Sequence, residues 1–132
     1  MKRYVFDSYP LFVYLEKEPN WEEVSEIFKN ALDNRCEIFM SAVNWGEVYY
    51  ITQREGGAEK AELYRKIIDA FPIEIIHTDE EQVLSAARYK AFNKISYADA
   101  FAASLSELRK ATLVTGDNEF RQIGRSIKIQ WV

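Results

Sequence analysis

The segment ISYADAFAASLSELRKATLVTGD, residues 95–117, combines a helix with the strand that follows it. Its opening, Ser96-Tyr97-Ala98-Asp99, is a helix-start signal with an acidic residue three positions after a capping serine. Thr112–Thr115 is short and apolar enough for a buried strand, and Gly116 is typical of a turn. A helix that leads into a strand in this way is one unit of an α/β fold.

The rest of the chain repeats this alternation. The predicted order is β-α-α-β-α-α-β-α-α-β-β, with a short turn or helix near residues 118–123. The expected strands cover residues 3–6, 37–40, 73–76, 112–115 and 127–132. Strands separated by helices cannot be hairpins, so the sheet should be mainly parallel, with helices on both faces. We therefore expect a three-layer α/β/α sandwich around a five-stranded sheet, formed by residues 1–132 as a single domain.

Capping signals place the helix starts. Asn20 with Glu23 three positions later predicts one start, before apolar residues at helical spacing. Ser41 predicts a second start, and this helix should run to about Arg54 and stop at Gly56-Gly57. Thr78-Asp79-Glu80-Glu81 has the pattern of a further capping box. Pro10 suits the first turn of the first helix.

Composition fits one globular domain of 132 residues, with 48% hydrophobic and 14% aromatic residues. The single cysteine, Cys36, excludes a disulfide framework within one chain. A net charge of −4 argues against a general nucleic-acid coat protein, although a nuclease that binds cations can be acidic. The apolar start is interrupted by Asp7 and Pro10, and nowhere do 18 apolar residues run together, so we expect a cytoplasmic protein with no membrane span.

Four acidic residues should converge at one edge of the predicted sheet. Ligands of open α/β sheets bind beyond the carboxyl ends of the strands. Asp7 directly follows the first strand, and Asp117 follows the fourth after one glycine. Glu47 lies in the helix after the second strand, about 9 Å from its start, and Asp99 lies in the first turn of the helix that leads into the fourth strand.

Each acid also has a structural interpretation. Asp7 can cap the first helix, Asp99 can complete a capping box, and Asp117 can be a turn residue. Glu47 is harder to explain in this way because it shares a helix face with Val43 and Tyr50. The convergence of all four favours a functional site over four separate structural roles.

Converging carboxylates repel one another unless a cation neutralises them. Oxygen-only ligands suit Mg²⁺ or Mn²⁺ better than Zn²⁺, and His77 is the only histidine. Two such ions can activate water for phosphodiester hydrolysis. Hydroxyl and amide side chains near the acids are candidates for supporting hydrogen bonds: Ser8, Ser41, Asn44 and Thr115.

Four segments resemble the motifs of PIN-domain proteins, especially the VapC toxins of bacterial and archaeal toxin–antitoxin pairs. They are YVFDS (residues 4–8), NWGEVYY (44–50), ISYADAFAA (95–103) and VTGDNEF (114–120). The resemblance extends over the chain in the family's order. Two positions depart from the family pattern: Ser8, where threonine is common, and Pro10, where a small or aliphatic residue is usual.

The resemblance implies a Mg²⁺- or Mn²⁺-dependent ribonuclease that forms homodimers and is inhibited by a small antitoxin. Asp7, Glu47, Asp99 and Asp117 take the metal-site roles by motif match, and Thr115 a supporting role. The alternatives are a non-catalytic PIN-like module that binds RNA or protein, and a housekeeping RNA-processing nuclease. A receiver-type phosphoacceptor domain is disfavoured because Ser41 and His77 follow the second and third strands, and a haloacid-dehalogenase-like phosphatase because Asp7-Ser8-Tyr9 lacks a second aspartate.

Overall fold

Five strands, six α-helices and one 3-10 helix make up the computed structural model, which describes residues 1–123 and 125–132. The strands are β1 (Lys2–Phe6), β2 (Cys36–Ser41), β3 (Glu74–Ile76), β4 (Thr112–Thr115) and β5 (Ile129–Trp131). The helices are α1 (Ser8–Leu15), α2 (Trp21–Leu32), α3 (Ala42–Gly56), α4 (Ala58–Asp69), α5 (Glu80–Phe92), α6 (Tyr97–Arg109) and the 3-10 helix η1 (Asn118–Gln122). The predicted order of elements is confirmed, and most ends agree within one or two residues.

The strands form one sheet in the order β3-β2-β1-β4-β5, and each neighbouring pair is parallel. Tyr4 is in register with Ile38 of β2, and Val5 with Leu113 of β4. The carboxyl ends of the central strands β1, β2 and β4 therefore meet at the same edge. The predicted α/β class is confirmed.

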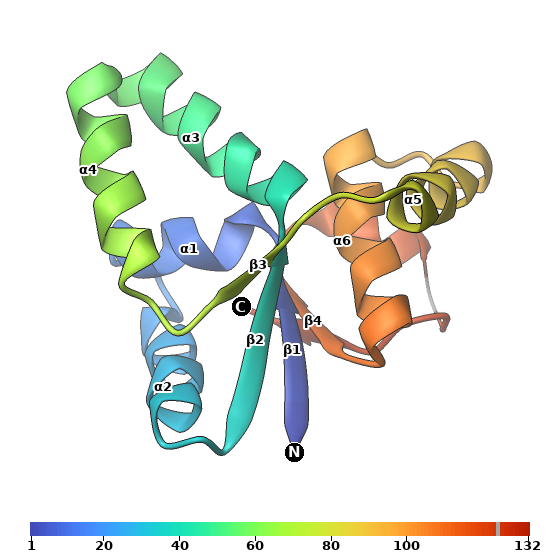
Figure 1. The fold of residues 1–132 in the computed structure, drawn as a ribbon, viewed down its shortest axis with the longest axis horizontal. Helices are drawn as coiled ribbons and strands as arrows, with labels where there is room; N and C mark the ends of the chain where they lie inside the picture. Colours follow the sequence, from blue (N-terminus) through green and yellow to red (C-terminus); the bar gives the residue numbers. More distant parts are fainter. Residues whose placement is uncertain (124) are drawn as a thin grey trace.

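Helices cover both faces of the sheet, because side chains alternate between the two faces along each strand. Val5, Phe39 and Leu113 point into a core built with α5 and α6. Phe6, Met40 and Val114 point into the opposite core, which is built with α1, α2, α3 and α4. The two groups of helices lie on opposite sides of the strands in Figure 1. This is the predicted three-layer arrangement.

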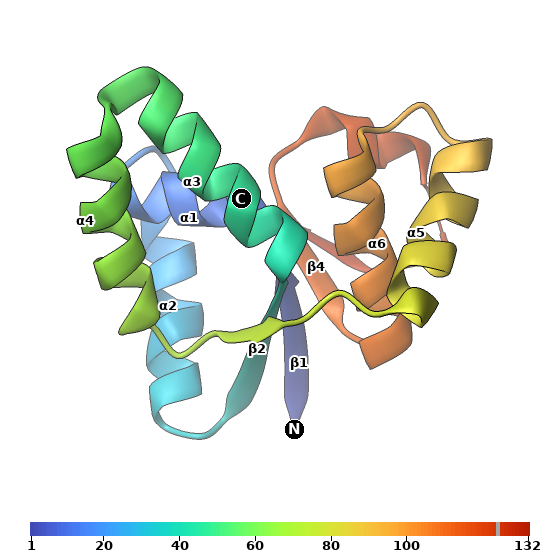
Figure 2. The same cartoon turned by 45° about the horizontal axis from the view of Figure 1, so that its top comes forward.

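Helices α3 and α4 form an antiparallel pair that rises from the carboxyl end of β2 (Figures 1 and 2). The turn between them lies at Gly57, whose φ of +92° is a conformation that side chains other than glycine rarely adopt. The predicted stop at Gly56-Gly57 is thus confirmed. Within the described residues, no helix is both long and apolar enough to cross a bilayer.

Three details of the helix starts and strand ends differ from prediction. Asn20 is the N-cap residue of α2, but its φ is +77° and its side chain makes no capping hydrogen bond. The N-cap of α5 is Asp79, which accepts a hydrogen bond from the Gln82 amide, so the predicted box beginning at Thr78 is displaced by one residue. Strand β5 covers only Ile129–Trp131, while Ile127 is buried outside the strand.

Candidate metal centre

The acidic residues predicted from sequence all lie at the carboxyl edge of the sheet. Asp7 follows β1, and Asp117 follows β4 after Gly116. Since β1 and β4 are paired, these two acids start from adjacent strands. Asp99 is in the first turn of α6, and Glu47 is in α3, two helices that pack against each other.

Asp7 is held in a fixed orientation and is only 2% exposed. One side-chain oxygen accepts a hydrogen bond of 2.9 Å from the Tyr9 amide, and the other accepts one of 2.6 Å from the Thr115 hydroxyl. Asp7 is therefore the N-cap residue of α1, and it also lies at the candidate metal centre. Burial, together with the smaller effects of the Glu47 and Asp117 charges, raises the pKa of Asp7 to about 7 despite these two hydrogen bonds.

Thr115 connects Asp7 to Asp117. Its hydroxyl donates to Asp7 and accepts a hydrogen bond of 3.0 Å from the Asp117 amide. The Asp117 carboxylate in turn accepts a 2.9 Å hydrogen bond from the Glu119 amide, which caps η1. This chain of hydrogen bonds fixes the turn after β4, and it is the arrangement expected of a supporting threonine.

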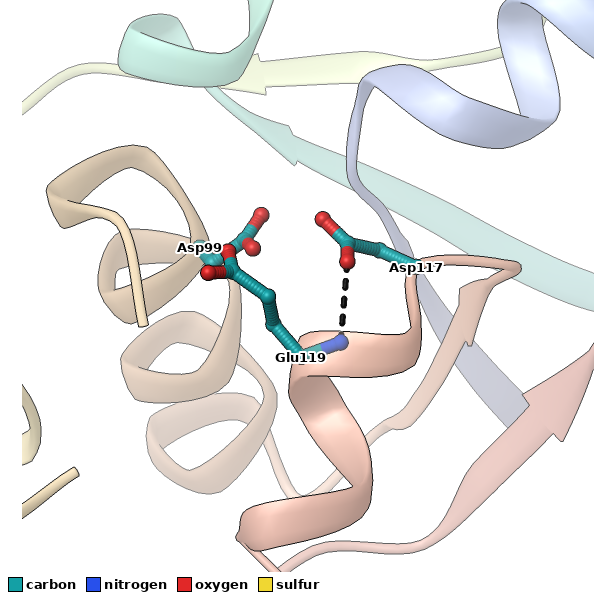
Figure 3. A group of neighbouring side chains, drawn as sticks. All are labelled: Asp99, Asp117 and Glu119. Carbon is teal, nitrogen blue, oxygen red and sulfur yellow. Dashed lines mark hydrogen bonds between the residues drawn. The ribbon is translucent and has the colours of Figure 1, made fainter. Parts of the chain in front are cut away.

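Asp99, Asp117 and Glu119 form the acid cluster, in which one carboxylate oxygen of each lies within 4.8 Å of the others (Figure 3). Asp99 is 4% exposed, and its Oδ2 atom is buried without a hydrogen-bond donor. Burial, followed by the neighbouring carboxyl groups of Asp117 and Glu119, raises the pKa of Asp99 to about 10. In the absence of a cation, the three carboxylates cannot all be ionised cheaply.

Asn44 and Glu47 approach the same region from α3. The Asn44 amide group donates a 3.1 Å hydrogen bond to the carbonyl of Ala98, next to Asp99 in the chain. The Asn44 side-chain carbonyl oxygen and one Glu47 carboxylate oxygen are buried and have no donor. Glu47 lies close enough to Asp7 for its charge to raise the Asp7 pKa.

The four predicted acids therefore do not all belong to one tight group. Asp99 and Asp117 share the acid cluster, as expected. Asp7 is linked to Asp117 through Thr115, but within residues 1–123 and 125–132 it is not part of a group as tight as the acid cluster. All four predicted acids lie at the carboxyl edge of the sheet, and two of them, Asp99 and Asp117, belong to the acid cluster. Ser8 is the first residue of α1 and is half-buried beside Tyr9.

Glu119 is the residue that sequence reasoning missed. The pattern Asp117-Asn118-Glu119, two acids flanking one residue just after a strand, was the available signal. The 3-10 turn of η1 carries the Glu119 side chain back towards Asp99 and lets it accept a 3.3 Å hydrogen bond from the Ser96 amide. Sequence spacing alone does not specify such a turn.

The ligand atoms of the site fit a hard divalent cation. Buried side-chain oxygens of Asp99, Glu47 and Asn44, one from each residue, accept no hydrogen bond. Buried acceptors without donors are costly, and a cation satisfies them. Carboxylate and amide oxygens suit Mg²⁺ or Mn²⁺, and the only histidine, His77, is exposed outside the site.

Gly116 lets the Tyr9 ring pack against the turn that carries Asp117. A Cβ atom at position 116 would lie 2.2 Å from a carbon of that ring. No side chain therefore fits there while the ring keeps its place beside Asp7.

Comparison with known families identifies the fold. The model of the PIN domain family matches residues 4–126. The chain belongs to the PIN-domain family. The four segments that resembled the family in sequence carry all four predicted acids of this PIN domain. A comparison with curated protein sequences finds no match.

Solved structures of toxin–antitoxin proteins share this PIN fold. DNA-bound VapBC from Salmonella typhimurium is 17% identical with a TM-score of 0.79, covering 99% of this chain and 98% of that one. VapBC2 from Rickettsia felis, bound to a promoter DNA fragment, is 18% identical with a TM-score of 0.74 and 98% coverage of both chains. VapC20 from Mycobacterium tuberculosis, a toxin that cleaves the sarcin–ricin loop, is 12% identical with a TM-score of 0.72, covering 95% and 98%. At these identities the similarity establishes the fold.

Proposed function

We propose that this PIN domain is a metal-dependent endoribonuclease that hydrolyses phosphodiester bonds of RNA. The observation that carries the proposal is the acid cluster, in which the buried Asp99 carboxylate, one of whose oxygens has no donor, faces the half-buried carboxylates of Asp117 and Glu119. Such a group costs folding free energy unless it binds cations. A domain whose acids had only structural roles would gain nothing from this repulsion.

The acidic residues of the site would bind the cation. Asp99, Asp117 and Glu119 would hold Mg²⁺ or Mn²⁺, with Asp7 and Glu47 completing the negative site. When bound, the cation supplies positive charge that stabilises the developing charge at phosphorus and polarises the attacking water.

The supporting side chains fix the acids before substrate arrives. Thr115 orients Asp7 and the Asp117 backbone, and Asn44 ties α3 to the first turn of α6. Ser8 is assigned such a role from its position beside Asp7. Fixed orientation reduces the rearrangement needed on binding RNA.

The biological role we favour is that of the toxin in a type II toxin–antitoxin pair. The similar solved structures include VapBC complexes and a toxin that cleaves the sarcin–ricin loop. A small antitoxin would then be the protein partner of this chain. A neighbouring gene that encodes a small DNA-binding protein favours the toxin, and its absence favours a housekeeping RNA-processing nuclease.

A homodimer is also part of the proposal, because the resemblance to VapC toxins implies one. On α3, Trp45 packs edge-on against Tyr49, and Tyr49 donates a hydrogen bond to Glu62 of α4. Tyr50 remains 53% exposed. Light scattering at micromolar concentration tests the dimer, and a monomer alone would refute it.

Cleavage of RNA tests the proposed activity. Purified wild-type protein should cut single-stranded RNA with Mg²⁺ or Mn²⁺ and lose this activity in excess EDTA. Asp99→Asn and Asp117→Asn should each reduce the rate by at least about 100-fold, because each removes charge from the cation site. Asp79→Asn, at the exposed N-cap of α5, is the matched control and should cut at the wild-type rate. Wild-type activity in EDTA, or near-normal activity of either site variant, would refute the metal mechanism.

A further inference from the structure

Two depressions next to the metal centre differ in charge. The first lies between α1 and α3, beside Asp7, and its lining includes Glu16, Glu18 and Glu55 but no lysine or arginine. Lys60 of α4 pairs with Glu16 at 3.3 Å, whereas Glu18 and Glu55 form no ion pair with the described residues. The second, of about 670 Å³, lies along the loop between α5 and α6 and includes Lys90 and Lys94. A polyanion that reaches the acid cluster meets repulsion on the first side and attraction on the second.

The second depression is continuous with the metal centre. Glu119, a member of the acid cluster, forms part of its lining, and so does Ser96, the N-cap residue of the helix that carries Asp99. The Ser96 amide also donates to the Glu119 carboxylate. A polyanion that lies in this depression can therefore contact the acid cluster directly.

An exposed aromatic ring stands at the depression. Phe92, the last residue of α5, is 87% exposed, the largest exposure of any aromatic side chain in the described part of the chain. Burying a phenylalanine is worth about 1.5–3 kcal/mol. A ring left in water at the rim of a polar site is therefore available to a ligand with an apolar face.

The loop that follows Phe92 is fixed to the metal centre by hydrogen bonds. Gln122, at the end of η1, accepts from the Lys94 amide at 3.3 Å and donates to the Lys94 carbonyl at 3.2 Å. The Lys90 ammonium donates to the Ile95 carbonyl at 2.7 Å, and the Asn93 side chain donates to the Tyr89 carbonyl at 3.0 Å. The position of Phe92 relative to η1 is therefore set before any ligand binds.

Two lysines, Lys90 and Lys94, line the same depression as Phe92. Lys94 is exposed, and its ammonium makes no ion pair with the residues that the structure describes. Lys90 adds a second positive charge although its ammonium bonds the loop. In a chain of net charge −4, two lysines around an exposed ring beside the acid cluster are suited to a nucleotide.

We propose that the depression along residues 90–96 is a nucleotide subsite for single-stranded RNA. One base stacks on the Phe92 ring, and the adjoining phosphate lies at Lys94. The strand leaves the metal centre on this side because the glutamates of the first depression repel it. Single-stranded RNA is required, since a base paired in a helix cannot present its face to the ring. This inference rests on the proposed RNA substrate.

A second copy of this chain is the competing occupant of Phe92. Val83 and Leu84 are also exposed on α5, at 36% and 48%, and belong to a face that another protein can cover. They lie two turns or more from Phe92, whereas Lys94 and Glu119 border the same depression as the ring. The charge of the surroundings therefore favours RNA.

Equilibrium binding separates these occupants. The probe is a fluorescently labelled 12-nucleotide single-stranded RNA of mixed sequence, measured by anisotropy in EDTA so that no cleavage occurs. Phe92→Ala should weaken binding by about 5- to 100-fold, the range for loss of one base–aromatic stack. Phe92→Leu should bind almost as weakly as the alanine variant, and Phe92→Trp should bind at least as well as wild type. Lys94→Ala should lower the slope of log affinity against log salt concentration by about 0.7, the value for one phosphate contact on a single strand.

Matched controls come from α2, on the far side of the sheet (Figure 1). Leu32 is 68% exposed and Lys29 is also exposed, so Leu32→Ala and Lys29→Ala remove an exposed apolar side chain and an exposed lysine elsewhere. Both should bind RNA as wild type does. Thermal melting of every variant checks the fold, and these exposed positions should leave the melting temperature within a few degrees of wild type.

The outcomes are distinguishable. If Phe92→Ala binds RNA as tightly as Leu32→Ala while the wild type still cuts RNA, the subsite is refuted and the proposed function stands. If Phe92→Ala converts a dimer to a monomer and Phe92→Leu restores both the dimer and RNA binding, the ring belongs to a protein interface and the subsite is refuted. If the wild type neither binds nor cuts RNA, the proposed function fails as well.

Discussion

Replacing Asp99 with asparagine should stabilise the protein when no divalent cation is present. The Asp99 carboxyl group has a pKa of about 10 in the folded chain and 3.8 as its reference value. At pH 7 the unfolded chain carries an ionised Asp99, whereas the folded chain must bind a proton there. Holding a proton about three pH units above the reference pKa costs about 4 kcal/mol. Solvent at the edge of the sheet screens part of this, so we expect a gain of about 1–3 kcal/mol.

The geometry around Asp99 favours asparagine as well. One oxygen of the Asp99 carboxyl group is buried without a donor, so the substitution removes no hydrogen bond that this oxygen accepts. The new amide group can donate to Asp117 or Glu119, which lie within 4.8 Å. The backbone amide of residue 99 keeps its 3.1 Å bond to Ser96, so the start of α6 is unchanged.

The difference in unfolding free energy between wild type and Asp99→Asn should depend on pH. A carboxyl group with a raised pKa binds a proton in the folded state over a pH range where the unfolded state does not. The unfolding free energy of the wild type should therefore fall as the pH rises from about 4 towards 10. The advantage of Asp99→Asn should vanish near pH 4 and be clear at pH 7 to 8.

Denaturant unfolding in EDTA at pH 4 and pH 7.5 measures both effects. Asp79→Asn is the control, because it changes a capping carboxylate outside the acid cluster and should alter stability by less than about 1 kcal/mol at either pH. Adding Mn²⁺ should stabilise the wild type more than Asp99→Asn, since a ligand stabilises only the state that binds it. A variant less stable than wild type at pH 7.5 in EDTA, or a difference that does not change with pH, would refute the electrostatic reasoning.

Three further predictions follow from the geometry of the site. Thr115→Val removes the hydroxyl that holds the adjoining acids, and it should lower the unfolding free energy by about 1–3 kcal/mol and RNA cleavage by about 10- to 100-fold, with Thr115→Ser near wild type in both assays. Gly116→Ala places a Cβ atom 2.2 Å from the Tyr9 ring, so it should lower the melting temperature, and a Tyr9→Ala background should recover most of the loss; equal losses in both backgrounds would contradict the steric explanation. Glu119→Gln should weaken Mn²⁺ binding in calorimetry by about 10-fold or more, whereas the exposed Glu18→Gln should not change it; equal affinities would remove Glu119 from the site.

Much of the fold was predictable because local signals and the overall pattern agree. Ser41 and Ser96 cap their helices as predicted, through hydrogen bonds to the amides of Val43 and Asp99. The alternation of helices and strands required a parallel sheet, and this requirement brings Asp7 and Asp117 to the same edge. Long-range convergence thus follows from topology even where the sequence separation exceeds 100 residues.

The parts that were missed depend on backbone geometry that spacing does not encode. Asn20 was expected to cap α2 with its side chain, but the left-handed conformation at this residue leaves the side chain without that hydrogen bond. The N-cap residue of α5 is Asp79 rather than Thr78, because the helix begins at Glu80 and the Asp79 side chain accepts a hydrogen bond from the Gln82 amide. Glu119 joins the acid cluster through the 3-10 turn of η1, and Asp7 is placed by Thr115 rather than within the acid cluster itself.

The most direct test of the central claim is a crystal structure of the wild-type protein soaked in Mn²⁺, with anomalous scattering recorded to locate the ion. We predict an anomalous peak between the carboxylates of Asp99, Asp117 and Glu119, and its loss in crystals of Asp99→Asn. Asp7 and Glu47 should face the same peak directly or through water. Well-diffracting crystals with no peak at these residues at millimolar Mn²⁺, or a peak bound only elsewhere on the surface, would contradict a metal centre at the carboxyl edge of the sheet.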